Sequence, residues 1–79
     1  MTDFELMGAA LEEARKAAEL GEVPVGAVVA KDGEIISAAH NTRETEKNAL
    51  HHAELLAIDA ACKKLGGWRL WQCELFVTL

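Results

Sequence analysis

Two apolar segments separated by a tight turn constrain the fold of this chain more than any other feature. Residues Val25 to Ala30 are apolar, Asp32-Gly33 supplies a two-residue turn, and Ile35 to Ala39 is again mostly apolar. Asp-Gly between two such segments is a strong signal for a β-hairpin, because both turn positions need positive φ. Pro24 precedes the first strand, where its missing N–H disrupts no ladder. The sequence therefore predicts two antiparallel strands.

A helix is predicted before this hairpin. Its apolar residues recur at three- and four-residue steps, which predicts one buried face; they are Phe4, Met7, Leu11, Ala14 and Ala18. Thr2 followed by Glu5 fits a capping box at the start of the helix, and Gly21 fits its end.

A second helix is predicted from about His52 to Leu65, and it is apolar on nearly every side. We therefore expect a central helix that is covered on most sides. Gly66-Gly67 ends it, and a connector, Trp68 to Trp71, follows, whose aromatic rings are expected to pack at the edge of the core rather than stack on bases. Cys73 to Leu79 alternates like a strand inside a sheet. The order helix, strand, strand, helix, strand predicts an α/β layered fold.

Composition limits the size and class of the protein. With 79 residues the chain forms at most one small domain, and 51% hydrophobic residues with a net charge of −5 are typical of a globular protein. The negative charge argues against a nucleic-acid partner without excluding one, because a local basic patch would suffice. The first residues lack a basic start, and no apolar run reaches the roughly 20 residues of a membrane span, so we expect a cytoplasmic protein. Cys62 and Cys73 are expected to be buried free thiols.

The triplet His52-Ala53-Glu54 lies where a polar segment gives way to the second helix. On a regular helix the outer two side chains would point about 200° apart, so they share a site only if His52 lies at the helix entrance. A metal ion held there by His52 would lower the pKa of its water toward neutrality, and Glu54 would take and return the proton. A Glu in a first helical turn is also common without any catalytic role. The triplet alone leaves both interpretations open.

Four blocks in order give the triplet its context: "ALEEARKAAELGEVPVGAVVAKDGEII", "HNTRET", "HAELLAI" and "WRLWQCELFVTL". With these blocks the chain resembles the zinc-dependent nucleobase deaminases, most closely the bacterial tRNA-specific adenosine deaminases. The known signature of these enzymes is His-x-Glu followed by Pro-Cys-x-x-Cys, and the triplet matches its first part. The resemblance implies a cytidine-deaminase-like three-layer fold with a mixed sheet flanked by helices.

The resemblance also implies a role for each matching residue. His52 would be a Zn²⁺ ligand, and Glu54 would shuttle protons during hydrolytic deamination of the wobble adenosine of tRNA to inosine. Asn41 would hydrogen-bond the base, and Val23 and the backbone of Ala53 would line the pocket. An Asn side chain suits a purine edge because it offers a donor and an acceptor. The family further implies a homodimer.

The sequence departs from the family in two places. Leu50 and His51 stand where the family usually has Thr-Ala, so His51 adds bulk and a second imidazole near the metal. The family's two cysteine ligands would follow Leu79, so residues 1–79 are expected to be one partial deaminase domain. Cys62 lies about 15 Å along the helix from His52 and cannot replace them. A site made of His40, His51 and His52 would need unusual geometry.

Two other functions remain open. One is deamination of free guanine or cytosine on the same fold, since residues outside these 79 would select the substrate. The other is a non-catalytic module that only binds a partner chain, because a single His does not hold a catalytic zinc ion.

Overall fold

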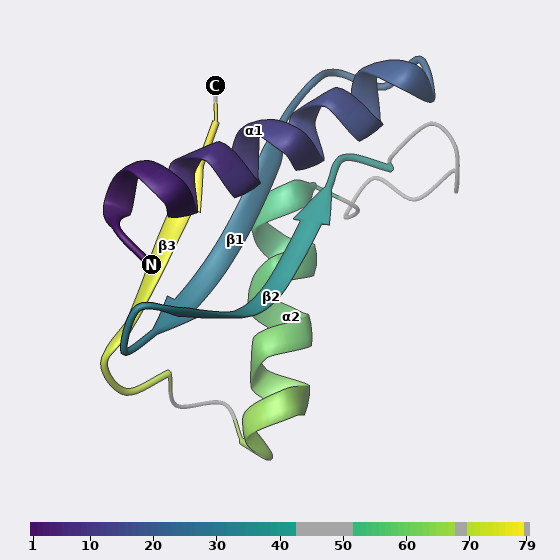
Figure 1. Cartoon of the computed structure of the whole chain (residues 1–79). Helices are drawn as coiled ribbons and strands as arrows, with labels where there is room; N and C mark the ends of the chain where they lie inside the picture. The colour runs from purple at the N-terminus through teal and green to yellow at the C-terminus, as the bar shows by residue number, and fades with distance from the viewer. Residues whose placement is uncertain (43–51, 68–69, 79) are drawn as a thin grey trace.

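The computed structural model describes residues 1–42, 52–67 and 70–78. Its elements follow the predicted order, and their bounds are α1 (Asp3–Glu19), β1 (Gly26–Lys31), β2 (Glu34–His40), α2 (Ala53–Leu65) and β3 (Cys73–Val77). Figure 1 shows the strands crossing the middle of the molecule, with the helices packed against them. None of the helices in this described part is long and apolar enough to cross a membrane.

The three strands form one sheet in the order β2-β1-β3, and both pairs are antiparallel. The hairpin is confirmed: β1 pairs with β2 from Gly26 opposite His40 to Lys31 opposite Glu34. Its turn has positive φ at both Asp32 (53°) and Gly33 (76°), as the Asp-Gly signal requires. The α/β class is confirmed, although these three strands contain no parallel pair of the kind that a mixed sheet has. The third strand, expected inside a sheet, lies at an edge here.

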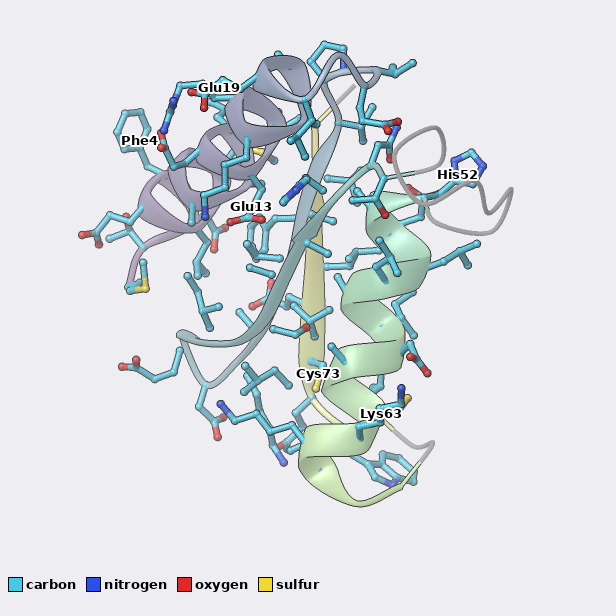
Figure 2. The ribbon with its side chains drawn as sticks, turned by 90° about the vertical axis from the view of Figure 1, so that its right-hand side faces the viewer. Phe4, Glu13, Glu19, His52, Lys63 and Cys73 are labelled. Carbon is cyan, nitrogen blue, oxygen red and sulfur yellow. The ribbon has the colours of Figure 1, made fainter. Side chains whose placement is uncertain are left out.

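The two helices lie on opposite faces of this sheet, which gives three layers (Figure 2). Ala27 and Val29 of β1 pack in one buried cluster with the small residues of α2, which are Ala53, Ala57 and Ala61. Because side chains alternate along a strand, Gly26 and Val28 face the other helix, α1. The core is therefore divided between the two faces of β1, the central strand.

The predicted buried face of α1 is wrong for most of its residues. The buried residues are Leu6, Ala10, Ala14 and Ala17, whereas Phe4 is 88% exposed and points away from the sheet (Figure 2). The reason is the close approach of α1 to β1. A Cβ on Gly26 would lie 2.0 Å from the carbonyl oxygen of Ala10, so only a helix face of small residues fits there.

The second helix also differs from its prediction. Its buried residues lie on one face, and Leu55 is exposed, so it is not covered on most sides by the described residues. It begins at Ala53, with His52 as the N-cap, and it ends at Gly66 with φ of 75°. The core packing expected of the connector's aromatic rings is wrong for Trp71, which is exposed. Trp68 and Arg69 lie outside the described residues.

The two cysteines are free, as expected, but each is half-buried rather than buried. Cys73 begins β3 and packs against the cluster formed by β1 and α2. Cys62 lies in the last turns of α2.

Candidate functional site

Three element ends meet at one end of the molecule: the start of β1, the end of β2 and the start of α2 (Figure 1). Asn41 joins them. Its backbone N–H donates to the carbonyl of Val25, 3.2 Å away, just before β1. Its side-chain Oδ1 accepts a hydrogen bond of 2.7 Å from the backbone N–H of Ala53, the first residue of α2. One side chain therefore ties the end of the hairpin to the start of the helix.

The orientation of the Asn41 amide follows from this bond. The Ala53 N–H is a donor, so the Asn41 atom that faces it is the oxygen, and the NH₂ group points elsewhere. Asn41 is only 6% exposed, so the amide is held in a packed environment. The acceptor half of the side chain is oriented toward the start of α2 by this hydrogen bond. The donor half is the part that can serve a bound molecule.

His52 has the N-cap position of α2, with extended dihedrals of φ −80° and ψ 145°. Its carbonyl accepts the first helical hydrogen bond, from the N–H of Leu56 at 3.0 Å, but its side chain makes no capping hydrogen bond. Because ψ is extended, His52 does not have helical backbone geometry, and its imidazole does not follow the side-chain spacing of a regular helix. Its Nδ1 lies 3.8 Å from Oε1 of Glu54, and both side chains are 39% exposed. The helix entrance therefore brings together two side chains that a regular helix would separate.

The other two predicted site residues lie at the same end of the fold. Val23 belongs to the connection between α1 and β1, and its side chain is exposed. Its carbonyl accepts a hydrogen bond from Val25, the residue that Asn41 contacts. Ala53 is fully buried, and its N–H is directed to Asn41 rather than to solvent. Direct contact of Val23 and Ala53 with a bound molecule stays a prediction.

The available ligands decide how well a zinc ion fits this site. A partly exposed imidazole at a helix entrance is a suitable ligand, but zinc in proteins takes about three or four protein ligands. Among residues 1–42, 52–67 and 70–78, no group of three or more His, Cys, Asp or Glu side chains could hold a metal ion. His51 lies outside the described residues. Within the described part, the ligand role of His52 stays a prediction, and no second ligand stands beside it in a group that could hold a metal ion.

Sequence reasoning missed three features beside this site. Oδ1 of Asn41 caps α2 from 12 residues away, and Glu13 of α1 pairs with His40, the residue before Asn41, at 2.9 Å. Neither pair has a local sequence signal, because its partners lie in different elements. Thr42, next to Asn41, has a buried Oγ1 for which no hydrogen-bond partner is found among the described residues. A Thr after an Asn would not by itself have indicated this.

Burial and hydrogen bonding act in opposite directions on Glu13. Burial, the largest influence, raises the pKa of its carboxyl group, but hydrogen bonds from His40 and Lys16 outweigh it and lower the pKa below 4.5 overall. The carboxylate is therefore ionised at neutral pH. Since an ionised carboxylate only accepts hydrogen bonds, Nδ1 of His40 carries the proton and donates it.

Comparison with known proteins places the chain in a family. The zinc-binding region of cytidine and deoxycytidylate deaminases matches residues 1–79. A tRNA-specific adenosine deaminase of Bacillus subtilis is 59% identical over 80 residues, covering all of this chain and 50% of the relative. The chain therefore spans about half the length of the curated relatives it matches.

Two solved structures share the fold. One, from studies of A-to-I editing by tRNA:A34 deaminases at the wobble position of transfer RNA, is 41% identical, with a TM-score of 0.91 over 95% of this chain and 58% of that one. The other, a guanine deaminase from Bacillus subtilis, is 36% identical, with a TM-score of 0.92 over 98% of this chain and 50% of that one. Because the family match extends over every residue, the chain belongs to the zinc-binding family of cytidine and deoxycytidylate deaminases.

Proposed function

We propose that the complete protein catalyses the zinc-dependent hydrolytic deamination of the wobble adenosine of tRNA to inosine. Residues 1–79 would be the N-terminal part of its deaminase domain. The observation that carries the proposal is the position of His52, Glu54 and Asn41 at one helix entrance in a chain 59% identical to a tRNA-specific adenosine deaminase.

In this proposal His52 holds the zinc ion as one ligand, and the remaining ligands come from the family's Pro-Cys-x-x-Cys sequence, in the half of the relatives that this chain does not cover. A bound zinc ion would act as a Lewis acid that activates water near neutral pH. Glu54 is not a ligand. Its carboxylate accepts a proton from water, gives it to a ring nitrogen of the base, and assists the departure of ammonia.

The position of Glu54 supports this role. It lies in the first turn of α2, at the helix entrance beside His52, and its side chain is partly exposed. A proton can therefore reach Oε1 from the open side of the site. The 3.8 Å separation from His52 Nδ1 brings the carboxylate beside the ligand without using it up in a hydrogen bond.

Asn41 binds the base through its NH₂ group, because its oxygen is oriented toward the Ala53 N–H and the NH₂ group points elsewhere. A donor in that position pairs with an acceptor on a purine, such as a ring nitrogen or a carbonyl oxygen. Ala53 acts through its backbone by fixing the Asn41 amide, and Val23 lines the pocket with its exposed side chain. Both assignments carry over the family pattern residue by residue.

Deamination of free guanine is the second candidate, since the guanine deaminase structure superposes as well as the tRNA:A34 deaminase structure. Both reactions would use His52 and Glu54 in the same way. The identity of 59% to the tRNA enzyme favours the tRNA substrate. A non-catalytic binding module would retain the fold but would show neither bound zinc nor turnover.

We also infer that the complete protein is a cytoplasmic homodimer with tRNA as its partner. Large apolar side chains remain exposed on both helices, for example Phe4 on α1 and Leu55 on α2, and a second chain would cover some of them. Light scattering on the complete protein tests the dimer: a monomer mass at micromolar concentration would contradict it.

The proposal is tested with Glu54→Gln in the complete protein, assayed for inosine in tRNA and for ammonia release from free guanine. Removing the proton carrier should lower kcat at least about 10²-fold, which is the usual contribution of a general acid–base group, while zinc content is kept. Asp59→Asn, which neutralises an exposed carboxylate paired with Lys63 on the same helix, is the matched control and should retain activity. Full activity of Glu54→Gln would refute the assigned role.

Assays of the unmutated complete protein distinguish the candidate functions. Inosine formation in tRNA without guanine turnover supports the proposed function, guanine turnover alone supports the second candidate, and neither activity supports a binding module. Zinc analysis of His52→Ala adds an independent readout, because loss of one ligand should empty the site. Full zinc occupancy in that variant would refute His52 as a ligand.

A further inference from the structure

The contact between Glu13 and His40 connects α1 to the last residue of β2. Oε1 of Glu13 lies 2.9 Å from Nδ1 of His40, and the two side chains are only 13% and 23% exposed. Oε2 of the same carboxylate accepts from Lys16 Nζ at 2.8 Å, so both oxygens are used. Figure 2 shows Glu13 on the side of α1 that faces the sheet. This is a partly buried, charge-assisted contact rather than a surface ion pair.

Gly26 explains why these two residues meet. It pairs with His40 across the hairpin, and a Cβ added to it would lie 2.0 Å from the Ala10 carbonyl oxygen and 2.8 Å from Cβ of Glu13. Because Gly26 has no side chain, the backbone of α1 packs closely against the hairpin at the position where Gly26 pairs with His40. Glu13 is the residue of α1 that this approach places beside His40.

Asn41 follows His40 directly, and its side chain is bound to the other helix layer. Its Oδ1 accepts from Ala53 of α2, whereas His40 donates to α1. Consecutive residues of an extended segment point to opposite faces, so these two contacts attach the end of β2 to both layers at once. The backbone between them cannot shift without lengthening one of the two hydrogen bonds.

We propose that His40, held by Glu13, is a positioning residue for Asn41, fixing the direction in which the Asn41 NH₂ group is presented to the base. An Asn side chain has two rotatable bonds, and its oxygen is already committed to Ala53, so the placement of its backbone decides where the NH₂ group lies. The expected effect of His40 on substrate binding rests on the proposed function. Its expected effect on the hydrogen bond between Asn41 and Ala53 is independent of that function.

The experiment uses the complete protein and three substitutions. His40→Phe keeps a ring of similar size and removes the donor. His40→Asn restores a donor, because the Asn amide nitrogen occupies nearly the position of imidazole Nδ1. Glu12→Gln is the control, since it neutralises a neighbouring carboxylate of α1 that pairs with Arg15 at the exposed surface, away from β2.

The first readout is hydrogen exchange of the Ala53 amide by NMR, referenced to the amides of Val28 and Val29 in the core. His40→Phe should speed Ala53 exchange about fivefold relative to the core amides, the usual contribution of one intramolecular hydrogen bond, and His40→Asn should restore most of the protection. Glu12→Gln should leave it unchanged. A general loss of stability would accelerate all these amides together, and that result would overturn a specific positioning role.

The second readout is steady-state kinetics. A displaced Asn41 weakens a binding contact, so His40→Phe should raise KM about tenfold and change kcat less than about twofold, with recovery in His40→Asn. Unchanged Ala53 exchange in His40→Phe would overturn the inference. If the parent protein deaminates neither substrate, the proposed function is wrong, and the exchange measurement still supports or overturns the role of His40.

Discussion

Gly26→Ala tests the contact on which the packing of α1 depends. The new Cβ would lie 2.0 Å from the Ala10 carbonyl oxygen and 2.5 Å from the Ala14 backbone nitrogen, whereas real Cβ atoms essentially never come closer than 3.0 Å. The helix would have to move outward by at least the difference, 3.0 minus 2.0, or 1.0 Å. Both obstructing atoms belong to the backbone of a helix, so no side-chain rotation relieves the clash.

The expected loss of stability is about 3 kcal/mol, the upper part of the range for overpacking a core, because the displaced helix face includes the buried Ala10, Ala14 and Ala17. This corresponds to about a 100-fold smaller folding equilibrium constant, since each 1.4 kcal/mol is about tenfold. Urea unfolding of the complete protein, followed by circular dichroism, measures it as a lower midpoint at unchanged slope.

Gly8→Ala is the matched control. Gly8 lies in the same helix, and a Cβ there would meet nothing within 4 Å. Ala is the better helix former, so this substitution should stabilise the protein by about 0.5–1 kcal/mol. A Gly26→Ala protein as stable as the parent would refute the close approach of α1 to β1, and with it the reason given for the small-residue face of the helix.

Two further predictions concern α1. Thr2→Ala removes the hydroxyl that accepts from the Glu5 N–H at 3.2 Å, so it should lower the unfolding free energy by about 1 kcal/mol. Thr2→Ser keeps the hydroxyl and should lower it less. Equal stability of the parent and Thr2→Ala would contradict the cap. Glu13 has a folded-state pKa lowered from 4.5, so its contribution to stability is fully present above that pH and is lost as the pH falls through the lowered value. The stability difference between the parent and Glu13→Gln should therefore shrink as the pH falls from 4.5 through the lowered pKa of Glu13. A difference independent of pH in urea titrations would show that ionisation of Glu13 does not matter.

Local signals in the sequence were sufficient to predict the helices, the strands and the turn between β1 and β2. Thr2 and Glu5 form the predicted capping box, and Asp32-Gly33 makes the predicted turn. Gly66 ends the second helix in the left-handed conformation that glycine favours. Each of these features depends on residues within four positions of one another, so the chain carries the information locally. The expectation that His52 would need non-helical geometry at the helix entrance rests on the same kind of reasoning.

The face of α1 that is buried could not be read in this way. Periodicity identified an apolar stripe through Phe4, Met7 and Leu11, and that stripe is real, but it lies on the outer side of the helix in the described fold. Where the helix backbone contacts Gly26, only the small residues Ala10 and Ala14 fit between α1 and the strand. The hydrophobic pattern shows which side chains are apolar. The shape of the surface against which the helix packs decides which of them are buried.

The sequence by itself determined the order of the elements, the two-residue turn of the hairpin, and the residue types His52, Glu54 and Asn41 that indicate deaminase chemistry. It did not determine the hairpin register, which shifts by one residue between Val29 and Ala30. Tertiary structure decided how those residues are held. Asn41 reaches Ala53 across 12 positions, and Glu13 reaches His40 across 27, so their hydrogen bonds exist only once two helices have packed on opposite faces of one sheet. Contacts between distant residues depend on the distances between elements, and packing alone sets those distances.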